Sequence, residues 1–510
     1  MDKIIVIDYG SQYNALIVRR IKDLGVIAKL YPPTVKADEI KKTEGVKGII
    51  LSGGPNSVND PQSPSIDKKI LELGLPVLGI CYGMQLISKI LGGEVSASRF
   101  HEYGNTICHF DVASPLFQGM SGTSKVYMSH GDTVTKVPED FHIICHSDNI
   151  ECAGIMNNRQ IYAIQFHPEV TNTVEGKKIL ENFTFNICKA HKDWNSDSFI
   201  EDKIQEIRKT VGDKNVLLGI SGGVDSAVTA VLLHKAIGDQ LTPVFIDHGL
   251  LRKDEAKKVK EMFHDKLHIK VIMADASDIF LSRLKGVTDP EQKRKIIGHT
   301  FIDVFKEETL KLNKKFDFLA QGTLYTDKVE SGQGGNSAVI KSHHNVGGLP
   351  KELGFRLIEP LDELYKDEVR EVGRKLGLDD AFVSRQPFPG PGLAIRCLGE
   401  ITPDKLRMVR ESDAILREEV EKAGLTKKIW QYFTVITPLK SVGVMGDQRT
   451  YWNTCAIRAV TSVDGMTSDF YHFDMDFLSK VSTRIVNEVP GINRVVYDIT
   501  SKPPSTIEWE

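Results

Sequence analysis

The segment Ser221-Gly222-Gly223-Val224-Asp225-Ser226 has the residue types and spacing to bind a phosphate group, and we call it the phosphate loop. Its glycines let backbone amides approach an anion, and its serine hydroxyls add further donors. No lysine closes the loop, and the chain contains no G-x-x-x-x-G-K-[ST] sequence. Because the loop carries an acid, Asp225, it suits a pyrophosphate that is bound to a metal ion. This predicts that ATP is cleaved between its α and β phosphates.

A cysteine between two glycines is the second candidate for chemistry. The run Gly79-Ile80-Cys81-Tyr82-Gly83 follows a predicted strand and begins a predicted helix, which is the pattern of a nucleophile elbow. A helix N-terminus favours the thiolate, the reactive form of Cys81. His167 and Glu169 stand two residues apart on an extended segment, so Glu169 can orient the ring while His167 takes the thiol proton. A lone cysteine is as often a small buried apolar residue, but the three together predict a Cys-His-Glu triad.

The cysteine motif resembles a known family. Gly79–Gln85 together with Gln165–Val170 is similar to the class I glutamine amidotransferases. The resemblance implies that Cys81 attacks the side-chain amide of glutamine, forms a thioester and releases ammonia. It also implies that the backbone amides of Gly54, in a glycine-rich turn, and of Tyr82 form the oxyanion hole. A plain turn between a strand and a helix is the alternative for the segment around Gly54.

The phosphate loop resembles the PP-loop of the N-type ATP pyrophosphatases. The resemblance implies that the substrate ATP is bound by Ser221, Gly222, Gly223, Val224, Asp225, Ser226 and Ala227. Because the departing pyrophosphate is highly charged, we expect Mg²⁺ as the cofactor. Asp225 is the residue that we expect to hold this metal.

The order of these parts resembles, over the whole chain, a family of enzymes that use glutamine to aminate xanthosine monophosphate (XMP). The resemblance rests on residues 341–348, 386–392 and 502–510. It implies that the substrate XMP is held by Arg294, Pro389, Gly390, Pro391, Gly392, Lys502 and Glu508. It also implies a lid over ATP that contains Asp327, Glu330, Lys341, His343 and His344. AMP would be transferred to the XMP oxygen, pyrophosphate would leave, and ammonia would attack the adenylated nucleotide.

Three alternatives stay open at this point. One is another glutaminase-coupled adenylating ligase, such as one acting on a nicotinate nucleotide, although Lys502, Glu508 and Pro389–Gly392 favour a purine nucleotide. A second is a nucleotide sensor that has lost turnover, against which the intact triad and phosphate loop argue. The third concerns His343 and His344, which could bind a metal, but no third ligand stands at a suitable spacing.

Two α/β patterns position these motifs. The strands predicted in the first are Ile4–Ile7, Gly48–Leu51, Pro76–Ile80 and Gln160–Phe166. Those predicted in the second are Val216–Ile220, Thr242–Asp247, Lys270–Ala274 and Phe318–Gln321. Residues 191–198 are polar and without periodicity, which indicates a linker between the two patterns. A smaller part follows, with strand-like segments at Arg494–Ile499 and Thr506–Trp509.

The fold class predicted from these patterns is α/β, with two open parallel-sheet domains followed by a smaller α+β domain. The first domain, residues 1–192, is the glutamine amidotransferase. The second, residues 193–385, is the ATP pyrophosphatase. The third, residues 386–510, is expected from the family resemblance to bind XMP and to form a homodimer.

Composition narrows the choice of partners. The net charge is −3 and both signs are interspersed, so no basic tract favours nucleic acid. We expect no membrane association, since there is no uninterrupted apolar run long enough to span a bilayer. The seven cysteines are dispersed without C-x-x-C spacing, which is typical of a reducing compartment and predicts a cytoplasmic protein.

Overall fold

A computed structural model of the chain describes residues 1–330, 355–462 and 467–510, except for the side chains of residues 98–101, 328–330 and 381. The described residues form two compact units. The first contains Met1–Glu201 and a segment that begins at Leu324, and the second contains Asp202–Thr323 and a segment that ends at Glu510. The three domain boundaries drawn from the sequence are finer than this division and stay predictions.

The first unit is built on a mixed sheet of nine strands in the order β2-β1-β3-β4-β9-β8-β7-β5-β6. Its parallel part consists of β2 (Ile27–Tyr31), β1 (Lys3–Ile7), β3 (Val46–Leu51), β4 (Val77–Ile80) and β9 (Ile161–Ile164). Its antiparallel part consists of β8 (Gly154–Asn157), β7 (Phe141–Ser147), β5 (Glu94–Phe110) and β6 (Thr123–Lys136). The four strands predicted for this region are therefore confirmed, whereas the antiparallel extension was not anticipated.

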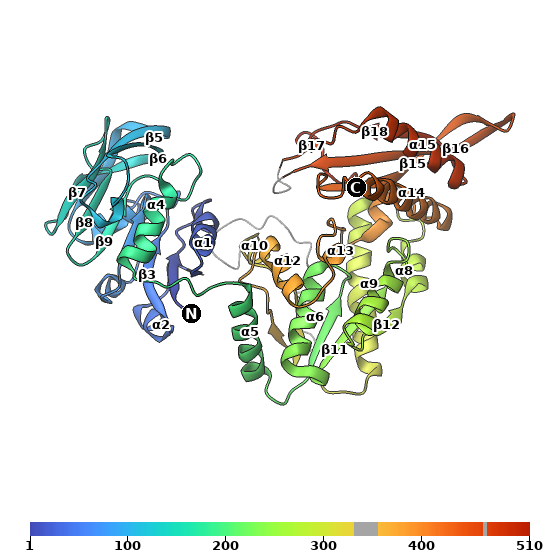
Figure 1. Ribbon diagram of the computed structural model, residues 1–510, viewed down its shortest axis with the longest axis horizontal. Helices are drawn as coiled ribbons and strands as arrows, with labels where there is room; N and C mark the ends of the chain where they lie inside the picture. Colours follow the sequence, from blue (N-terminus) through green and yellow to red (C-terminus); the bar gives the residue numbers. More distant parts are fainter. Residues whose placement is uncertain (331–354, 463–466) are drawn as a thin grey trace. The chain divides into compact units, whose positions relative to one another are not determined.

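Helices cover the parallel part of this sheet (Figure 1). The main ones are α1 (Asn14–Asp23), α2 (Ala37–Lys42), α3 (Tyr82–Ile90) and α4 (Gly176–Glu181). The α3 helix packs against β4, and α1 packs against β1 and β2. Strands covered on both faces must be apolar throughout, which explains continuous runs such as Ile4-Ile5-Val6-Ile7, all fully buried.

The second unit contains a parallel five-stranded sheet in the order β12-β11-β10-β13-β14. The strands are β10 (Val216–Ile220), β11 (Leu241–Asp247), β12 (Ile272–Asp275), β13 (Phe318–Ala320) and β14 (Arg356–Ile358). The helices are α6 (Val224–Ile237), α7 (Glu255–Lys260), α8 (Ser277–Leu284), α9 (Pro290–Lys311), α12 (Lys366–Lys375) and α13 (Asp380–Val383). All four strands predicted for this region are present.

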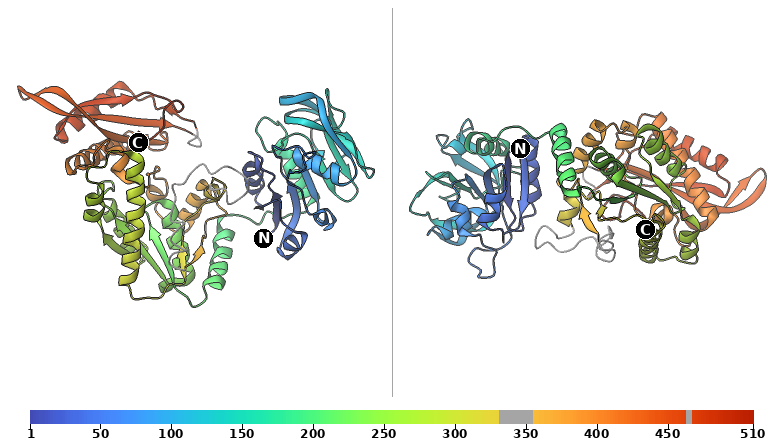
Figure 2. Two further views of the ribbon diagram at one scale, coloured as in Figure 1. Left: turned by 180° about the vertical axis from the view of Figure 1, so that it is seen from behind. Right: turned by 90° about the horizontal axis from the view of Figure 1, so that it is seen from below.

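A second, four-stranded sheet completes this unit. It is formed by β15 (Gln431–Met445), β16 (Gln448–Thr461), β17 (Asp469–Phe470) and β18 (Ile492–Asp498), with α14 (Pro403–Lys422) and α15 (Met475–Glu488) packed beside it. The β15–β16 hairpin projects from its unit in both the front and rear views (Figures 1 and 2). One hydrophobic cluster joins the two sheets and the helices beside them, because it contains Val244 of β11 and Phe305 of α9 together with Val409 of α14 and Ile457 of β16. The expected smaller α+β part is thus present and shares a core with the parallel sheet.

Two expectations about local structure were wrong. The predicted linker at residues 191–198 includes the start of helix α5 (Ser196–Val211). The polar residue Asn195 caps this helix, because its Oδ1 accepts from the Ser198 amide at 3.1 Å. The segment Thr506–Trp509 is not a strand; its side chains dock instead, with Trp509 Nε1 donating to Asp498 Oδ2 at 2.9 Å. Among the residues that the structure describes, no helix is long and apolar enough to cross a membrane.

Candidate functional site

Cys81 occupies a sharp turn between β4 and α3. Its φ of 50° and ψ of −105° are rarely adopted by L-residues, so neighbouring structure must hold the backbone there. A Cβ atom at Gly83 would lie 2.4 Å from the Leu51 carbonyl oxygen, and one at Gly79 would lie 2.8 Å from the Gly83 carbonyl oxygen. Close backbone packing therefore explains both flanking glycines. The turn has the geometry expected of a nucleophile elbow.

The structure brings Cys81, His167 and Glu169 together. His167 Nδ1 lies 2.8 Å from Glu169 Oε1, and both side chains are buried. A Cβ atom built on Gly53 would lie 3.0 Å from His167 Cε1 and 3.6 Å from Cys81 Cβ, so a side chain at this position would crowd both residues. Burial lowers the pKa of His167, but the charge of Glu169 and hydrogen bonds with Cys81 and Glu169 outweigh it and raise the pKa to about 10. The charged imidazolium is therefore the favoured form of His167 at neutral pH.

The two predicted oxyanion-hole residues lie on different segments: Tyr82 directly follows Cys81, and Gly54 directly follows Gly53, which lies near Cys81 and His167. Tyr82 is the first residue of α3, directly after Cys81. A Cβ atom at Gly54 would lie 2.5 Å from the Tyr9 carbonyl oxygen, which explains the glycine. Within the described part of the chain, the backbone amides of Gly54 and Tyr82 donate to no backbone carbonyl. These amides are consequently available to a substrate oxygen.

Several residues around the sulfur were not found from the sequence. Gln165 Nε2 donates to Cys81 Sγ at 3.6 Å, and the thiol lies 3.6 Å from the Ser129 carbonyl oxygen. Next to Ser129, the buried His130 places Nε2 3.2 Å from Glu102 Oε2. Glu102 and His130 are direct cross-strand partners on β5 and β6. Only the register of that hairpin, which the sequence did not show, could have revealed the pair.

The phosphate loop forms the predicted strand–turn–helix junction between β10 and α6. Gly222 has a φ of 77°, which favours glycine, and Gly223 is the N-cap of α6. Ser221 and Ser226 lie close together, with their hydroxyl oxygens 3.1 Å apart. The Gly223 amide donates to Ser221 Oγ at 3.3 Å, so this serine hydroxyl is the acceptor for a backbone amide of the turn. Ala227 follows in the first turn of the helix.

Two cations from distant parts of the chain reach this loop. Lys366, the first residue of α12, places Nζ 2.7 Å from Asp225 Oδ1. Arg385 donates from Nη1 to the Gly222 carbonyl oxygen at 3.3 Å and pairs with Glu255. The absence of a lysine within the loop is thus compensated by Lys366, which stands 141 positions further along the chain. No local motif could have identified it.

The donor set at the loop fits Mg²⁺ that is bound together with a pyrophosphate. Mg²⁺ commonly takes only one or two carboxylates from a protein, and its other ligands are phosphate oxygens and waters. Asp225 supplies one carboxylate, and its side chain is partly exposed. Among the described residues, no group of three or more His, Cys, Asp or Glu side chains could enclose a metal ion alone. The loop therefore suits a metal that arrives with its phosphate ligand.

Most of the predicted lid lies outside the described residues. This applies to Lys341, His343 and His344 and to the segment 331–337, and Glu330 is described only as the last residue of α10 (Tyr325–Glu330). Asp327 Oδ2 accepts from the Leu324 amide at 2.9 Å.

The predicted XMP residues lie on three segments of the second unit. Arg294 is in the first turns of α9, and Glu508 accepts two hydrogen bonds from the buried Arg396 guanidinium, at 2.8 and 3.2 Å. Pro389–Gly392 packs against the carboxyl end of β11, because Leu393 N donates to Leu250 O at 2.8 Å. Lys502 lies on the same C-terminal segment as Glu508 and exchanges backbone hydrogen bonds with Ser468.

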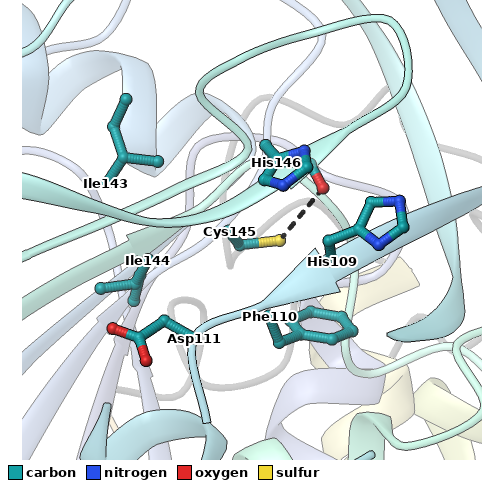
Figure 3. Close-up of a pocket in the computed structure, with 7 residues that line it drawn as sticks. All are labelled: His109, Phe110, Asp111, Ile143, Ile144, Cys145 and His146. Atoms are coloured by element: carbon teal, nitrogen blue, oxygen red, sulfur yellow. Dashed lines mark hydrogen bonds between the residues drawn. The ribbon is translucent and has the colours of Figure 1, made fainter. Parts of the chain in front are cut away.

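A separate hollow of about 230 Å³ lies on β5 and β7 (Figure 3). His109 and His146 stack at its rim with ring centroids 4.8 Å apart, and His109 faces Asp148. Its lining consists of His109, Phe110, Asp111, Ile143, Ile144, Cys145 and His146. None of these is a predicted site residue, so this hollow is distinct from the triad and from the phosphate loop.

Comparisons with known proteins cover the whole chain. Residues 5–187 match the family described as glutamine amidotransferase class-I, residues 195–299 that described as NAD synthase, and residues 418–509 that described as GMP synthase C terminal domain. GMP synthase (glutamine-hydrolyzing) of Lactobacillus gasseri is 59% identical over 513 residues, spanning 100% of this chain and 98% of that protein. The Bacillus cytotoxicus protein of the same name is 57% identical over 510 residues, spanning 100% of this chain and 99% of its own.

Proposed function

The chain belongs to the glutamine-hydrolysing GMP synthase family, and on that premise we propose that it aminates XMP to GMP, with nitrogen from glutamine. ATP is cleaved to AMP and pyrophosphate in the same reaction. The observation that carries the proposal is the joint presence in one chain of an assembled Cys81-His167-Glu169 cluster and a phosphate loop. The first suits the release of ammonia, and the second suits the departure of pyrophosphate.

In the glutaminase step, Cys81 attacks the side-chain carbonyl carbon of glutamine. His167 holds the proton taken from the thiol, and Glu169 stabilises the resulting imidazolium, which is supported by the raised pKa of His167. The amides of Gly54 and Tyr82 donate to the oxyanion of the tetrahedral intermediate. His167 then returns its proton to the departing ammonia, leaving a glutamyl thioester that water hydrolyses.

In the synthetase step, the XMP oxygen attacks the α-phosphate of ATP. The amides of the phosphate loop and the ammonium of Lys366 stabilise the negative charge on the pyrophosphate as it leaves. Mg²⁺, when bound, neutralises part of that charge. Asp225 would hold the metal. To do so, its carboxylate must give up the ion pair with Lys366 and bind the metal ion in its place. Lys366 is then free to contact phosphate oxygens instead.

The acceptor XMP is held by Arg294, Pro389–Gly392, Lys502 and Glu508. Arg294 and Lys502 supply positive charge for its phosphate. Glu508 offers carboxylate oxygens to N–H groups of the base, after release from Arg396. The family resemblance assigns a lid over ATP to Asp327, Glu330, Lys341, His343 and His344, of which the last three lie outside the described residues.

The protein forms a homodimer through its third domain, residues 386–510. The projecting β15–β16 hairpin supports this, because Leu439, Val444 and Tyr451 are each more than 60% exposed, at 63%, 74% and 63%. Burial of such side chains against a second copy would stabilise the association. We expect the molar mass in solution to be that of two chains and to halve in Val444→Lys. A monomeric wild-type protein would contradict the dimer but not the reaction.

The reaction is tested by analysing nucleotide products with XMP, ATP and Mg²⁺, and with either glutamine or ammonium as the nitrogen donor. We expect GMP, AMP and pyrophosphate in equal amounts with both donors. ADP and phosphate would contradict the adenylation step. A parallel assay replaces XMP by a nicotinate nucleotide, since residues 195–299 match the NAD synthase family; amination of that acceptor in preference to XMP would support the alternative ligase.

A further inference from the structure

Lys293 is a fully buried lysine in the first turns of α9. Its side chain has no exposed surface, whereas the neighbouring Lys295 on the same helix is exposed. Lysine is among the residues least often buried completely, because removing an ammonium from water is costly unless every donor finds a partner. The surroundings of Lys293 must therefore supply those partners.

Three acceptors surround the Lys293 ammonium. Its Nζ donates to the carbonyl oxygens of Ala394, at 3.2 Å, and Cys397, at 2.9 Å, and it forms an ion pair with the Glu510 carboxylate. An ammonium has three N–H donors, so each has one acceptor. The second oxygen of Glu510 accepts from the Gly399 amide at 2.9 Å, so this carboxylate is held at both oxygens.

These partners belong to the segments proposed to hold XMP. Ala394 lies in the 3₁₀ helix Gly392–Arg396, which begins at the last residue of the Pro389–Gly392 loop. Glu510 lies two positions after Glu508, and its carbonyl oxygen accepts from Arg294 Nη2 at 2.6 Å. Arg294 itself is the residue next to Lys293. One buried ammonium thus joins helix α9, the proline-glycine loop and the segment that contains Glu508.

We infer that Lys293 is a positioning residue for the XMP site, which it assembles by holding these three segments in register without contacting the nucleotide. The inference rests on the proposed XMP residues. Without the ammonium, the Glu510 carboxylate would lose its ionic partner and two carbonyls would lose a donor in a buried site. The segment around Glu510 would then detach, and Glu508 and Arg294 would lose their relative placement.

The test replaces Lys293 by methionine, which has a similar length but no charge. We expect the KM for XMP to rise by about tenfold or more in the ammonium-dependent reaction, since small misplacements of binding groups have large kinetic effects. The KM for ATP and the rate of glutamine hydrolysis should stay within about twofold of the wild type. Lys295→Met removes an exposed lysine from the same helix and should leave all three values unchanged.

A second variant covers the case in which Lys293→Met fails to fold. Glu510→Gln keeps the shape of the side chain and removes only the charge that balances the ammonium, and we expect a smaller rise in the KM for XMP, with kcat at saturating XMP retained. Folded variants that keep the wild-type KM for XMP would overturn the inference. So would a rise shared equally by XMP and ATP, which would indicate general destabilisation. A wild-type enzyme that forms no AMP with XMP would instead refute the proposed function.

Discussion

The first unit contains two buried histidine–glutamate pairs, His167–Glu169 and His130–Glu102. Their closest nitrogen–oxygen distances are 2.8 and 3.2 Å, and all four side chains are almost completely buried. The pKa of His167 is nevertheless raised to about 10, whereas the pKa of His130 is lowered, with burial as the main cause. The same two residue types thus give opposite charge states at neutral pH.

The two pairs differ in what else contacts the carboxylate and the histidine. Glu102 is shared, because its Oε1 also accepts from Ser147 Oγ and Asn149 Nδ2, both at 3.0 Å. In Glu169, the other oxygen, Oε2, is buried without a hydrogen-bond partner. Its charge therefore acts mainly on His167, which also interacts with the Cys81 thiol. Neighbouring groups, rather than the two residue types themselves, distinguish the neutral histidine from the charged one.

The largest effect is expected from Cys81→Ala. This substitution removes the thiol that interacts with His167. Glutamine-dependent formation of GMP should fall by about three orders of magnitude or more, because the nucleophile is lost. The rate with added ammonium should remain near that of the wild type, since the phosphate loop lies in the second unit. Equal loss with both nitrogen donors would show that Cys81 has a structural role.

Glu169→Gln should have the next largest effect. Without the carboxylate charge, the pKa of His167 falls and the imidazolium is no longer stabilised when His167 takes the thiol proton, so glutamine hydrolysis should slow by about 10²–10⁴-fold. Stability provides an independent measurement. Because folding raises the pKa of His167 from its ordinary value of 6.5 to about 10, the charged imidazolium stabilises the folded state. This stabilisation is complete below pH 6.5 and is lost as the pH rises through about 10. The melting-temperature difference between wild type and variant should therefore shrink over this range, and a constant difference would contradict the ion pair.

The proximity of His167 and Glu169 could be predicted from the sequence, whereas that of His130 and Glu102 could not. His167 and Glu169 are two positions apart on one extended segment, so local geometry alone places them on the same side. Glu102 and His130 meet only because β5 and β6 pair in a register interrupted by bulges. The same reasoning applies to Lys366 and Lys293, whose partners stand more than 100 positions away. Motifs and the positions of strands along the chain follow from local patterns, whereas polar partners that are distant in sequence depend on the packed fold.

Removing the shared carboxylate in Glu102→Ala should mainly reduce stability. Ser147 and Asn149 would each lose a hydrogen bond to the carboxylate in a buried site, which we expect to cost about 2–3 kcal/mol. The measurement is a denaturant titration that follows the unfolding of the first unit. Glutamine hydrolysis is assayed at denaturant concentrations well below the unfolding midpoint. The hydrolysis rate should fall far less than in Glu169→Gln. A loss of activity as large as in that variant would mean that His130 and Glu102 take part in the chemistry.

The smallest effect is expected from Glu102→Gln, although the same change at Glu169 should be severe. A neutral His130 donates from Nδ1 to the Asp132 carbonyl oxygen at 2.9 Å, so its Nε2 can accept a hydrogen bond. A glutamine amide would donate to Nε2, while its oxygen keeps Ser147 and Asn149 as donors. Every partner is then satisfied, and the unfolding free energy should change by less than about 1 kcal/mol. A loss as large as in Glu102→Ala would show that the network requires the carboxylate charge, which would remove the contrast between the two pairs.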